Sequence, residues 1–220
     1  MAANKLEFFF DFISPYAYFA HDQLHSFCEE HELTLEYRPV VFGVLLDRWG
    51  HLGPAEIPPK REWLIKFCLY YAEKHNLSFT FPPQHPFNPL HALRASLASV
   101  CGDSQYDLIQ ALFRGAWVEG QDLSNQATVL KICEQVGMDA NTVASLINSD
   151  TVKSELKLEL ERAVDLGIFG VPTLKYDGDL YWGSDQFDYL SAVIKGEYHH
   201  NQERLQQLLS GPRGIDRKRK

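Results

Sequence analysis

The chain has 220 residues, of which 45% are hydrophobic and 23% charged, a composition typical of a globular protein with a core of its own. Its net charge of −8 argues against a general nucleic-acid or anionic-membrane binder, so we expect neither partner. The basic run at residues 217–220 is predicted to be a solvated tail. We also expect no secretion signal and no membrane-spanning segment.

The four cysteines are Cys28, Cys68, Cys101 and Cys133, and their spacing fits neither a Cys-x-x-Cys pair nor a zinc site. Their even number leaves disulfides open by counting alone. All four lie in apolar helical stretches, where a free buried thiol is the commoner outcome. We therefore expect a reducing, cytoplasmic location.

The first 42 residues predict a strand, a helix and a second strand. Residues 6–12 form an apolar run typical of a buried strand, interrupted by Glu7 and by Asp11 near its end. Ser14 and Pro15 are favoured at the cap and first position of a helix. Residues 33–40 alternate as a second strand does, which gives a right-handed βαβ unit.

The rest of the chain is helical until residue 171. A loop is predicted at 49–59 and a short extended piece at 77–81, with helices at 60–74, 88–101, 106–117, 124–136, 141–147 and 151–166. Residues 173–176 and 180–182 predict a β-hairpin with its turn at 177–179. A helix capped by Ser184 or Asp185 ends at Gly196, and a polar helix follows at 199–209.

This order predicts an α/β protein, a thioredoxin-like fold with an inserted all-helical domain. The two halves of the thioredoxin-like domain are residues 1–42 and 167–220, and the helical insertion is residues 43–166.

The strand-to-helix turn is the first candidate for chemistry. In a thioredoxin-like fold it holds the active site, where helix N–H groups and the helix dipole lower the pKa of a thiol. Ser14 stands there and is no redox centre, but its hydroxyl can donate a hydrogen bond to a thiolate of a bound cofactor. The alternative is that Ser14 is only a helix cap.

Two further segments could form the other walls of a ligand site. A cis Val171–Pro172 bond, typical at this place in thioredoxin-like folds, would leave the Val171 N–H and C=O free to pair with a peptide-like ligand. Near the last helix, Ser184 and backbone amides suit a carboxylate, and Asp185 suits an ammonium group. A trans proline at a strand start and plain capping by Asp185 are the alternatives.

Together these motifs resemble those of the 2-hydroxychromene-2-carboxylate isomerases, which belong to the DsbA-like group and are close relatives of the kappa-class glutathione transferases. The resemblance runs through nearly the whole chain. It rests on Phe-Asp-Phe-Ile-Ser-Pro-Tyr-Ala-Tyr at 10–18, His-Pro-Phe-Asn-Pro-Leu at 85–90 followed by Ala-Leu-Arg at 92–94, Trp-Val-Glu-Gly at 117–120, the segment 167–173, and Trp-Gly-Ser-Asp at 182–185.

The resemblance implies a set of site residues. Ser14 matches the catalytic serine at the glutathione sulfur, and Val171, with Pro172 beside it, matches the residue whose backbone pairs with the cysteinyl part. Trp182, Gly183, Ser184 and Asp185 match the segment around the γ-glutamyl group. Asn88 is the residue implied to contact the second substrate, whereas Arg94 could equally be a structural ion-pair partner. The segment 44–59 aligns only loosely with the family's substrate-binding loop, so no substrate-contacting residue is inferred from it.

The function that follows is a glutathione-dependent isomerase acting on an unsaturated aromatic carboxylate such as 2-hydroxychromene-2-carboxylate. A homodimer is implied by the relatives. A kappa-like glutathione transferase or peroxidase is the first alternative, and a non-catalytic glutathione- or partner-binding module is the second. A thiol-disulfide oxidoreductase is disfavoured, because residues 14–17 contain no cysteine.

Two features have a stronger ordinary explanation than a functional one. His21, His25 and Cys28 have metal-like spacing on one helix, but three ligands on one helix rarely converge, so no metal is expected. Arg48 could meet a substrate carboxylate, yet a solvated arginine is the simpler interpretation.

Overall fold

The computed structural model describes residues 4–212 and 214, so the predicted basic tail at 217–220 lies outside the described residues. The chain divides into two compact units, Met1–Gln186 and Phe187–Lys220. The boundaries predicted for the helical insertion, 43–166, stay a prediction.

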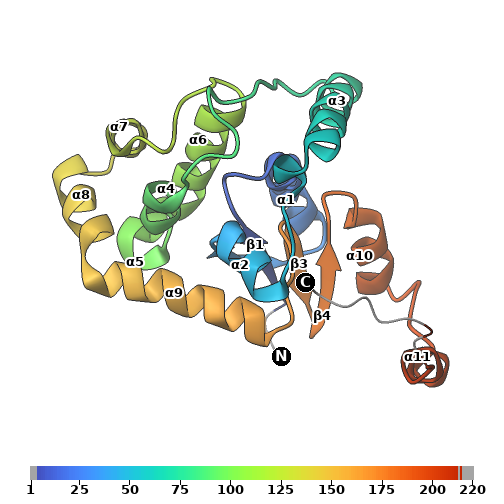
Figure 1. Ribbon diagram of the computed structural model, residues 1–220. Helices are drawn as coiled ribbons and strands as arrows, with labels where there is room; N and C mark the ends of the chain where they lie inside the picture. Colours follow the sequence, from blue (N-terminus) through green and yellow to red (C-terminus); the bar gives the residue numbers. More distant parts are fainter. Residues whose placement is uncertain (1–3, 213, 215–220) are drawn as a thin grey trace. The chain divides into compact units, whose positions relative to one another are not determined.

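A four-stranded mixed sheet lies in the first unit, in the order β2-β1-β3-β4 (Figure 1). Strand β1 (Lys5–Phe10) pairs parallel with β2 (Thr34–Pro39) and antiparallel with β3 (Thr173–Tyr176), which pairs with β4 (Asp179–Trp182). Asp177 and Gly178 both have positive φ, 47° and 91°, the conformation that a two-residue hairpin turn needs. The predicted βαβ unit and hairpin are confirmed.

Strand β1 is buried on both faces, which explains its almost continuous apolar sequence. Successive side chains of a strand point to opposite faces. Phe8 and Phe10 stack on one face, where Phe10 also contacts Phe113. Phe9 lies in the cluster on the other face, with Leu45 and Ala163 among its members.

Most of the predicted helices are confirmed with small changes at their ends. They are α1 (Pro15–Glu30), α3 (Pro58–Lys74), α6 (Gln105–Trp117), α7 (Gln126–Gln135), α8 (Ala140–Asn148) and α9 (Asp150–Asp165). Helices α4 to α8 gather on one side of the sheet, and α9 runs from them back to contact β2 and α2 (Figure 1).

Three local predictions are wrong. The helix expected at 88–101 is two helices, α4 (Leu90–Ala95) and α5 (Ala98–Cys101), because Leu97 is extended and the Ser96 hydroxyl binds the Leu93 carbonyl in between. The piece at 77–81 is not a strand; the Thr80 N–H donates instead to the Trp117 carbonyl.

The third error is the missed helix α2 (Phe42–Trp49), which is followed by the short helix η1 (Pro54–Glu56). Phe42, Leu45 and Trp49 recur at helical spacing, but Gly43 and the Gly/Pro-rich loop obscured the pattern. The helix ends at Gly50, whose left-handed φ of 65° suits glycine.

In the second unit the described residues form two helices, α10 (Phe187–Ile194) and α11 (Gln202–Leu209). Gly196, with φ of 70°, follows α10 as predicted. Helix α11 begins later than residue 199 because Asn201 caps it, accepting a hydrogen bond from the Arg204 N–H.

A buried carboxylate joins the sheet to α9. Glu7 of β1 is 6% exposed and accepts hydrogen bonds from Arg38, Lys175 and Arg162. Burial raises the pKa of Glu7, but the bonds from Lys175 and Arg162 outweigh it and hold the pKa at about 2. The charged form is therefore the one that the folded chain favours.

The low pKa of Glu7 predicts that the folded protein loses stability in acid. The contribution of Glu7 to stability is complete above its ordinary pKa of 4.5 and is lost as the pH falls toward about 2. We expect the free energy of unfolding of the wild type to lose about 2 kcal/mol from this group over that window, and Glu7→Gln to lose much less. Urea unfolding across the same pH range measures it, with Glu134→Gln on the exposed face of α7 as control; parallel curves for wild type and Glu7→Gln would contradict the prediction.

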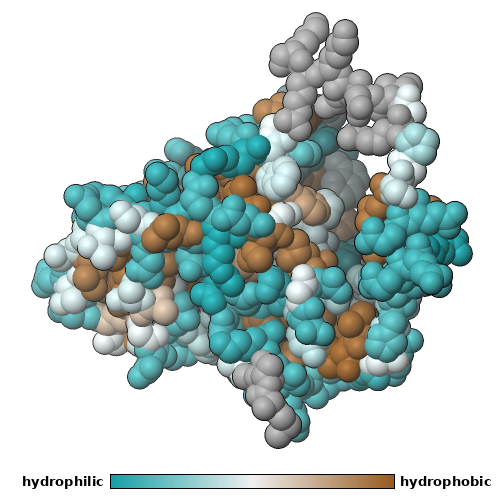
Figure 2. All heavy atoms as spheres, turned by 90° about the horizontal axis from the view of Figure 1, so that it is seen from below, coloured by the Kyte–Doolittle hydropathy of each residue, from teal (hydrophilic) through white to brown (hydrophobic). Residues whose placement is uncertain are grey.

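Polar and apolar side chains share the surface. Hydrophilic side chains cover much of the face seen from below, with apolar side chains emerging between them (Figure 2). A search of the described residues finds no helix with the length and apolar character needed to span a membrane.

Candidate functional site

A cavity of about 740 Å³ lies in the first unit, a volume within the usual range of ligand pockets. Its walls come from segments far apart in the sequence: the N-terminus of α1, the stretch from Val41 to Glu56, the start of α3, His85–Pro86, Phe169–Val171, and Trp182. Most of the lining side chains are apolar, so bound groups lose much of their water there.

Ser14 lies at the N-terminal end of α1 and lines this cavity. It is 6% exposed, and its Oγ accepts a hydrogen bond of 3.2 Å from the Ala17 N–H, so the predicted cap is confirmed. A hydroxyl that accepts through a lone pair still has its own proton to donate. Among the described residues neither this proton nor the Tyr16 N–H has a partner, and both belong to the positive end of the helix dipole.

The loop before β3 forms the opposite wall. Val171 lines the cavity, and the Val171–Pro172 bond is cis. In the described part of the chain, the Val171 N–H and C=O make no hydrogen bond. Both are therefore available to a ligand with peptide groups.

Trp182 connects this loop to the end of β4. Its indole touches Gly170 so closely that a Cβ on Gly170 would lie 2.6 Å from Trp182 Nε1. The Gly183 N–H donates to the Pro172 carbonyl at 3.0 Å. Gly183 has φ of 125°, and a Cβ there would meet Asp185 Oδ1 at 2.6 Å. Gly170 thus leaves room for the Trp182 indole, and the positive φ of Gly183 favours glycine at the end of β4.

Three other segments of the chain hold the turn at residues 11–14. The fully buried Asp11 accepts from the Ile13 N–H at 3.1 Å and from the Phe42 N–H at 2.9 Å, which ties the turn to α2. Trp117 Nε1 donates to the Phe12 carbonyl at 2.8 Å, and His85 Nε2 lies 3.0 Å from the Ile13 carbonyl oxygen. Burial raises the pKa of Asp11 to about 7, against the N–H bonds, which lower it.

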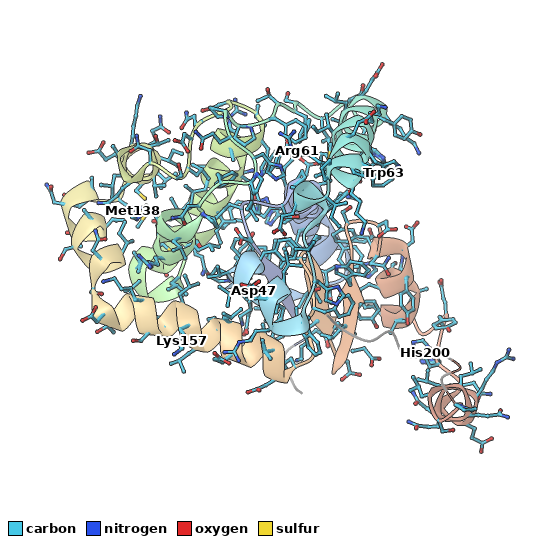
Figure 3. The ribbon with its side chains drawn as sticks, viewed as in Figure 1. Asp47, Arg61, Trp63, Met138, Lys157 and His200 are labelled. Carbon is cyan, nitrogen blue, oxygen red and sulfur yellow. The ribbon has the colours of Figure 1, made fainter. Side chains whose placement is uncertain are left out.

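Half of the lining residues come from the stretch 41–56, which overlaps most of the segment 44–59 that aligns only loosely with the substrate-binding loop of the family. It contributes apolar side chains such as Leu46 and Leu52, together with Asp47 and His51. Figure 3 labels Asp47 on α2 and Arg61 at the start of α3. Lys60, the neighbour of Arg61, lines the cavity and has no ion pair within the described residues.

The predicted site residues divide into two groups. Ser14, Val171 and Trp182 share the cavity, whereas Pro172, Gly183, Ser184 and Asp185 lie beside it along the chain without lining it. Asn88 is exposed, does not line the cavity, and accepts from the Leu90 N–H at 3.1 Å. The role of each of these residues stays a prediction.

Three residues for which the sequence favoured a structural role bind other residues of the chain. Arg94 Nη1 donates to the Ile147 carbonyl, and Arg48 pairs with Glu161 of α9. His21 Nε2 lies 3.2 Å from the Tyr37 hydroxyl oxygen. A search of the described residues finds no group of three His, Cys, Asp or Glu side chains that could hold a metal ion.

Sequence reasoning did not assign Asp11, His85 or Lys60 to the site. Asp11 was visible as an acid in an apolar strand, which is a signal for a buried, hydrogen-bonded carboxylate. His85 and Lys60 gave no such signal, because a single histidine or lysine in a loop or helix is ordinary.

The fold and the position of Ser14 define a thioredoxin-like protein with serine at the strand-to-helix turn before α1. The chain belongs to the family of DSBA-like thioredoxin domains, whose sequence profile matches residues 5–195. The predicted family and fold are therefore confirmed.

Two named proteins and one solved structure are similar to this chain over most of its length. The 2-hydroxychromene-2-carboxylate isomerase of Sphingobium xenophagum is 27% identical over 193 residues, covering 87% of this chain and 98% of that protein. Glutathione S-transferase kappa 1 of Rattus norvegicus is 23% identical over 209 residues, covering 88% of this chain and 92% of that protein. A solved structure of a 2-hydroxychromene-2-carboxylate isomerase superposes with a TM-score of 0.80 at 20% identity, covering 94% of this chain and 100% of that one.

Proposed function

We propose that this chain is a glutathione-dependent isomerase of an unsaturated aromatic carboxylate such as 2-hydroxychromene-2-carboxylate. One observation supports it most. The Ser14 hydroxyl, at the N-terminus of α1, shares a cavity of about 740 Å³ with the unpaired backbone of Val171. The names of the relatives point to the same two chemistries, isomerisation and glutathione use.

The donors in the cavity fit glutathione. A thiolate needs hydrogen-bond donors and a positive potential, and the Ser14 O–H and the Tyr16 N–H offer both at the end of α1. Glutathione is a peptide, and the Val171 N–H and C=O can pair with its cysteinyl part as a strand would. In this proposal Trp182, Gly183, Ser184 and Asp185 surround the γ-glutamyl group, beside Pro172.

When bound, glutathione supplies a thiolate that adds to a conjugated double bond and leaves again after the bond has rotated. Ser14 donates a hydrogen bond to the sulfur and so favours the charged thiol. The apolar wall of α2 and η1 excludes water and receives the aromatic ring. Lys60 is the cation available to the substrate carboxylate, since it has no anionic partner among the described residues.

The test is binding followed by turnover. Calorimetry of the purified protein should show saturable glutathione binding. Conversion of 2-hydroxychromene-2-carboxylate should then require glutathione without consuming it, because addition and elimination return the thiol.

A kappa-like transferase would instead form a stable conjugate with a chloro-nitro aromatic, the second reaction to assay in view of the similarity to glutathione S-transferase kappa 1. Glutathione binding without turnover of either electrophile would favour a non-catalytic binding module. No glutathione binding at all would contradict the proposal.

We also propose a cytoplasmic homodimer. All four cysteines are free and buried, which agrees with a reducing compartment. Helix α3 exposes Trp63, Leu69 and Tyr70 by 59%, 53% and 57%, an apolar face of the kind that a second copy covers. Sedimentation of the protein at several concentrations would establish its oligomeric state.

A further inference from the structure

His85 is bound to the residue next to Ser14. Its Nε2 lies 3.0 Å from the Ile13 carbonyl oxygen, and its ring packs edge-on against Phe81 and Trp117, with centroids 5.8 and 5.5 Å away. The ring is half-buried and lines the same cavity as Ser14. It is thus fixed in place although it comes from a segment some 70 residues further along the chain.

The hydrogen bond determines the tautomer. A carbonyl oxygen only accepts, so Nε2 carries the proton and, in the neutral ring, Nδ1 keeps its lone pair. Nδ1 has no partner in the described part of the chain and is not one of its fully buried unpaired atoms, so its lone pair is free to accept a proton. Burial lowers the pKa of His85 from its usual 6.5 and Arg61 lowers it further, against the bond to Ile13. The imidazole is therefore neutral at pH 7.

We propose that His85 is the catalytic base of this site, with Nδ1 taking the proton of the glutathione thiol. This rests on the proposed function, which requires a thiolate at Ser14. An unperturbed thiol has a pKa of about 8.5 and is mostly protonated at neutral pH, so a base beside the helix end increases the reactive fraction. Ser14 then stabilises the thiolate that His85 has produced.

The proton transfer is balanced within the site. The S–H bond breaks and its electron pair stays on sulfur, while the proton bonds to the lone pair of Nδ1. The resulting imidazolium keeps its Nε2–H bond to the Ile13 carbonyl, an acceptor that favours the positive charge. Nδ1 returns the proton when glutathione leaves as a thiol, so no other reactant is needed.

Other charged groups surround this histidine and affect its titration. Arg61 and Lys60 lie at the start of α3, and Asp11 lies in the turn. Across the cavity are Asp47, His51 and Glu56. Arg61 opposes protonation of His85, whereas an ionised carboxylate close to the ring would favour it.

The test separates two roles of His85: accepting a proton at Nδ1 and holding the Ile13 carbonyl through Nε2. In His85→Gln the amide nitrogen can replace Nε2 as donor to Ile13, but no basic nitrogen replaces Nδ1. The ultraviolet absorbance of the thiolate, titrated with glutathione bound, reports the proton directly. We expect the midpoint of the bound thiol to rise by about one pH unit, turnover at pH 7 to fall about tenfold, and the Kd for glutathione to change less than about threefold.

Two further variants serve as controls. His25→Gln makes the same change on the exposed side of α1 and should match the wild type. His85→Phe keeps the ring packing but loses both nitrogens. The proposal is overturned if His85→Gln has the same thiol midpoint and turnover as the wild type and only His85→Phe is less stable. That result would mean that His85 only holds the Ile13 carbonyl in place. No glutathione binding to the wild type would overturn the proposed function and the base together, and it would appear before any variant is compared.

Discussion

Replacing Ser14 with alanine should remove most of the turnover while leaving glutathione binding in place. A hydrogen bond to a charged group contributes about 1.5–3 kcal/mol, which corresponds to a loss of roughly 10- to 100-fold in rate. The backbone of Val171 and the segment 182–185 would still hold the peptide, so the Kd for glutathione should change little. Steady-state kinetics and calorimetry on the same preparation measure the two effects separately.

The capping role of Ser14 needs its own control, because its Oγ also accepts from the Ala17 N–H. Loss of such a cap costs about 1 kcal/mol of stability. Ser149 is a comparable cap: its Oγ accepts from the Val152 N–H at 3.3 Å at the start of α9 and donates to the Leu146 carbonyl at 2.7 Å, and it does not line the cavity.

Ser149→Ala should therefore lower thermal stability at least as much as Ser14→Ala, whereas only Ser14→Ala should lose turnover. Ser14→Thr keeps the hydroxyl and should retain part of the activity. Full turnover in Ser14→Ala would show that Ser14 is only a cap.

Replacing Trp117 with alanine should destabilise the fold by about 3–5 kcal/mol, the usual cost of emptying a large aromatic site in a core. Trp117 is fully buried, and its ring stacks on Phe79 with centroids 5.7 Å apart. Its Nε1–H also donates to the Phe12 carbonyl in the turn before Ser14. Urea unfolding followed by circular dichroism measures the free energy.

Trp117→Phe separates the two contributions. It keeps most of the packing but leaves the Phe12 carbonyl without its donor, at a cost of about 1–3 kcal/mol. Because that carbonyl lies two residues before Ser14, we also expect reduced turnover in the folded variant. Leu158→Ala, at a side chain 68% exposed on α9, should change stability by less than about 0.5 kcal/mol. Equal stability of Trp117→Ala and Leu158→Ala would contradict the proposed importance of Trp117.

Both predictions concern the same turn. The ends of the turn are determined by neighbouring residues: strand β1 precedes it, and the Ser14 cap of α1 follows it. Residues 11–13 are held by contacts with distant segments. The Asp11 carboxyl accepts from the Phe42 N–H of α2, Trp117 donates to the Phe12 carbonyl, and His85 binds the Ile13 carbonyl. The helical part of the chain therefore shapes the turn at residues 11–14 as well as lining the cavity.

Local features of the sequence were enough to predict much of this protein. The apolar run of β1, the Ser14–Pro15 helix start and the Asp177–Gly178 turn each depend on neighbouring residues, so a short stretch of sequence carries the whole signal. Their order along the chain then predicted the thioredoxin-like fold. The break between α4 and α5 was missed because it depends on the conformation of Leu97, which its apolar surroundings do not reveal.

The sequence alone thus determined the fold class and the position of Ser14, Val171 and Trp182 as candidates for one ligand site. Only the tertiary structure brought α2, η1, Lys60 and His85 to the cavity and showed that Asn88 does not line it. The reason is physical: periodicity and capping act over a few residues, whereas the cavity forms where segments up to 170 residues apart pack together. For a lone histidine such as His85, its partner decides its chemistry, and the fold alone supplies that partner.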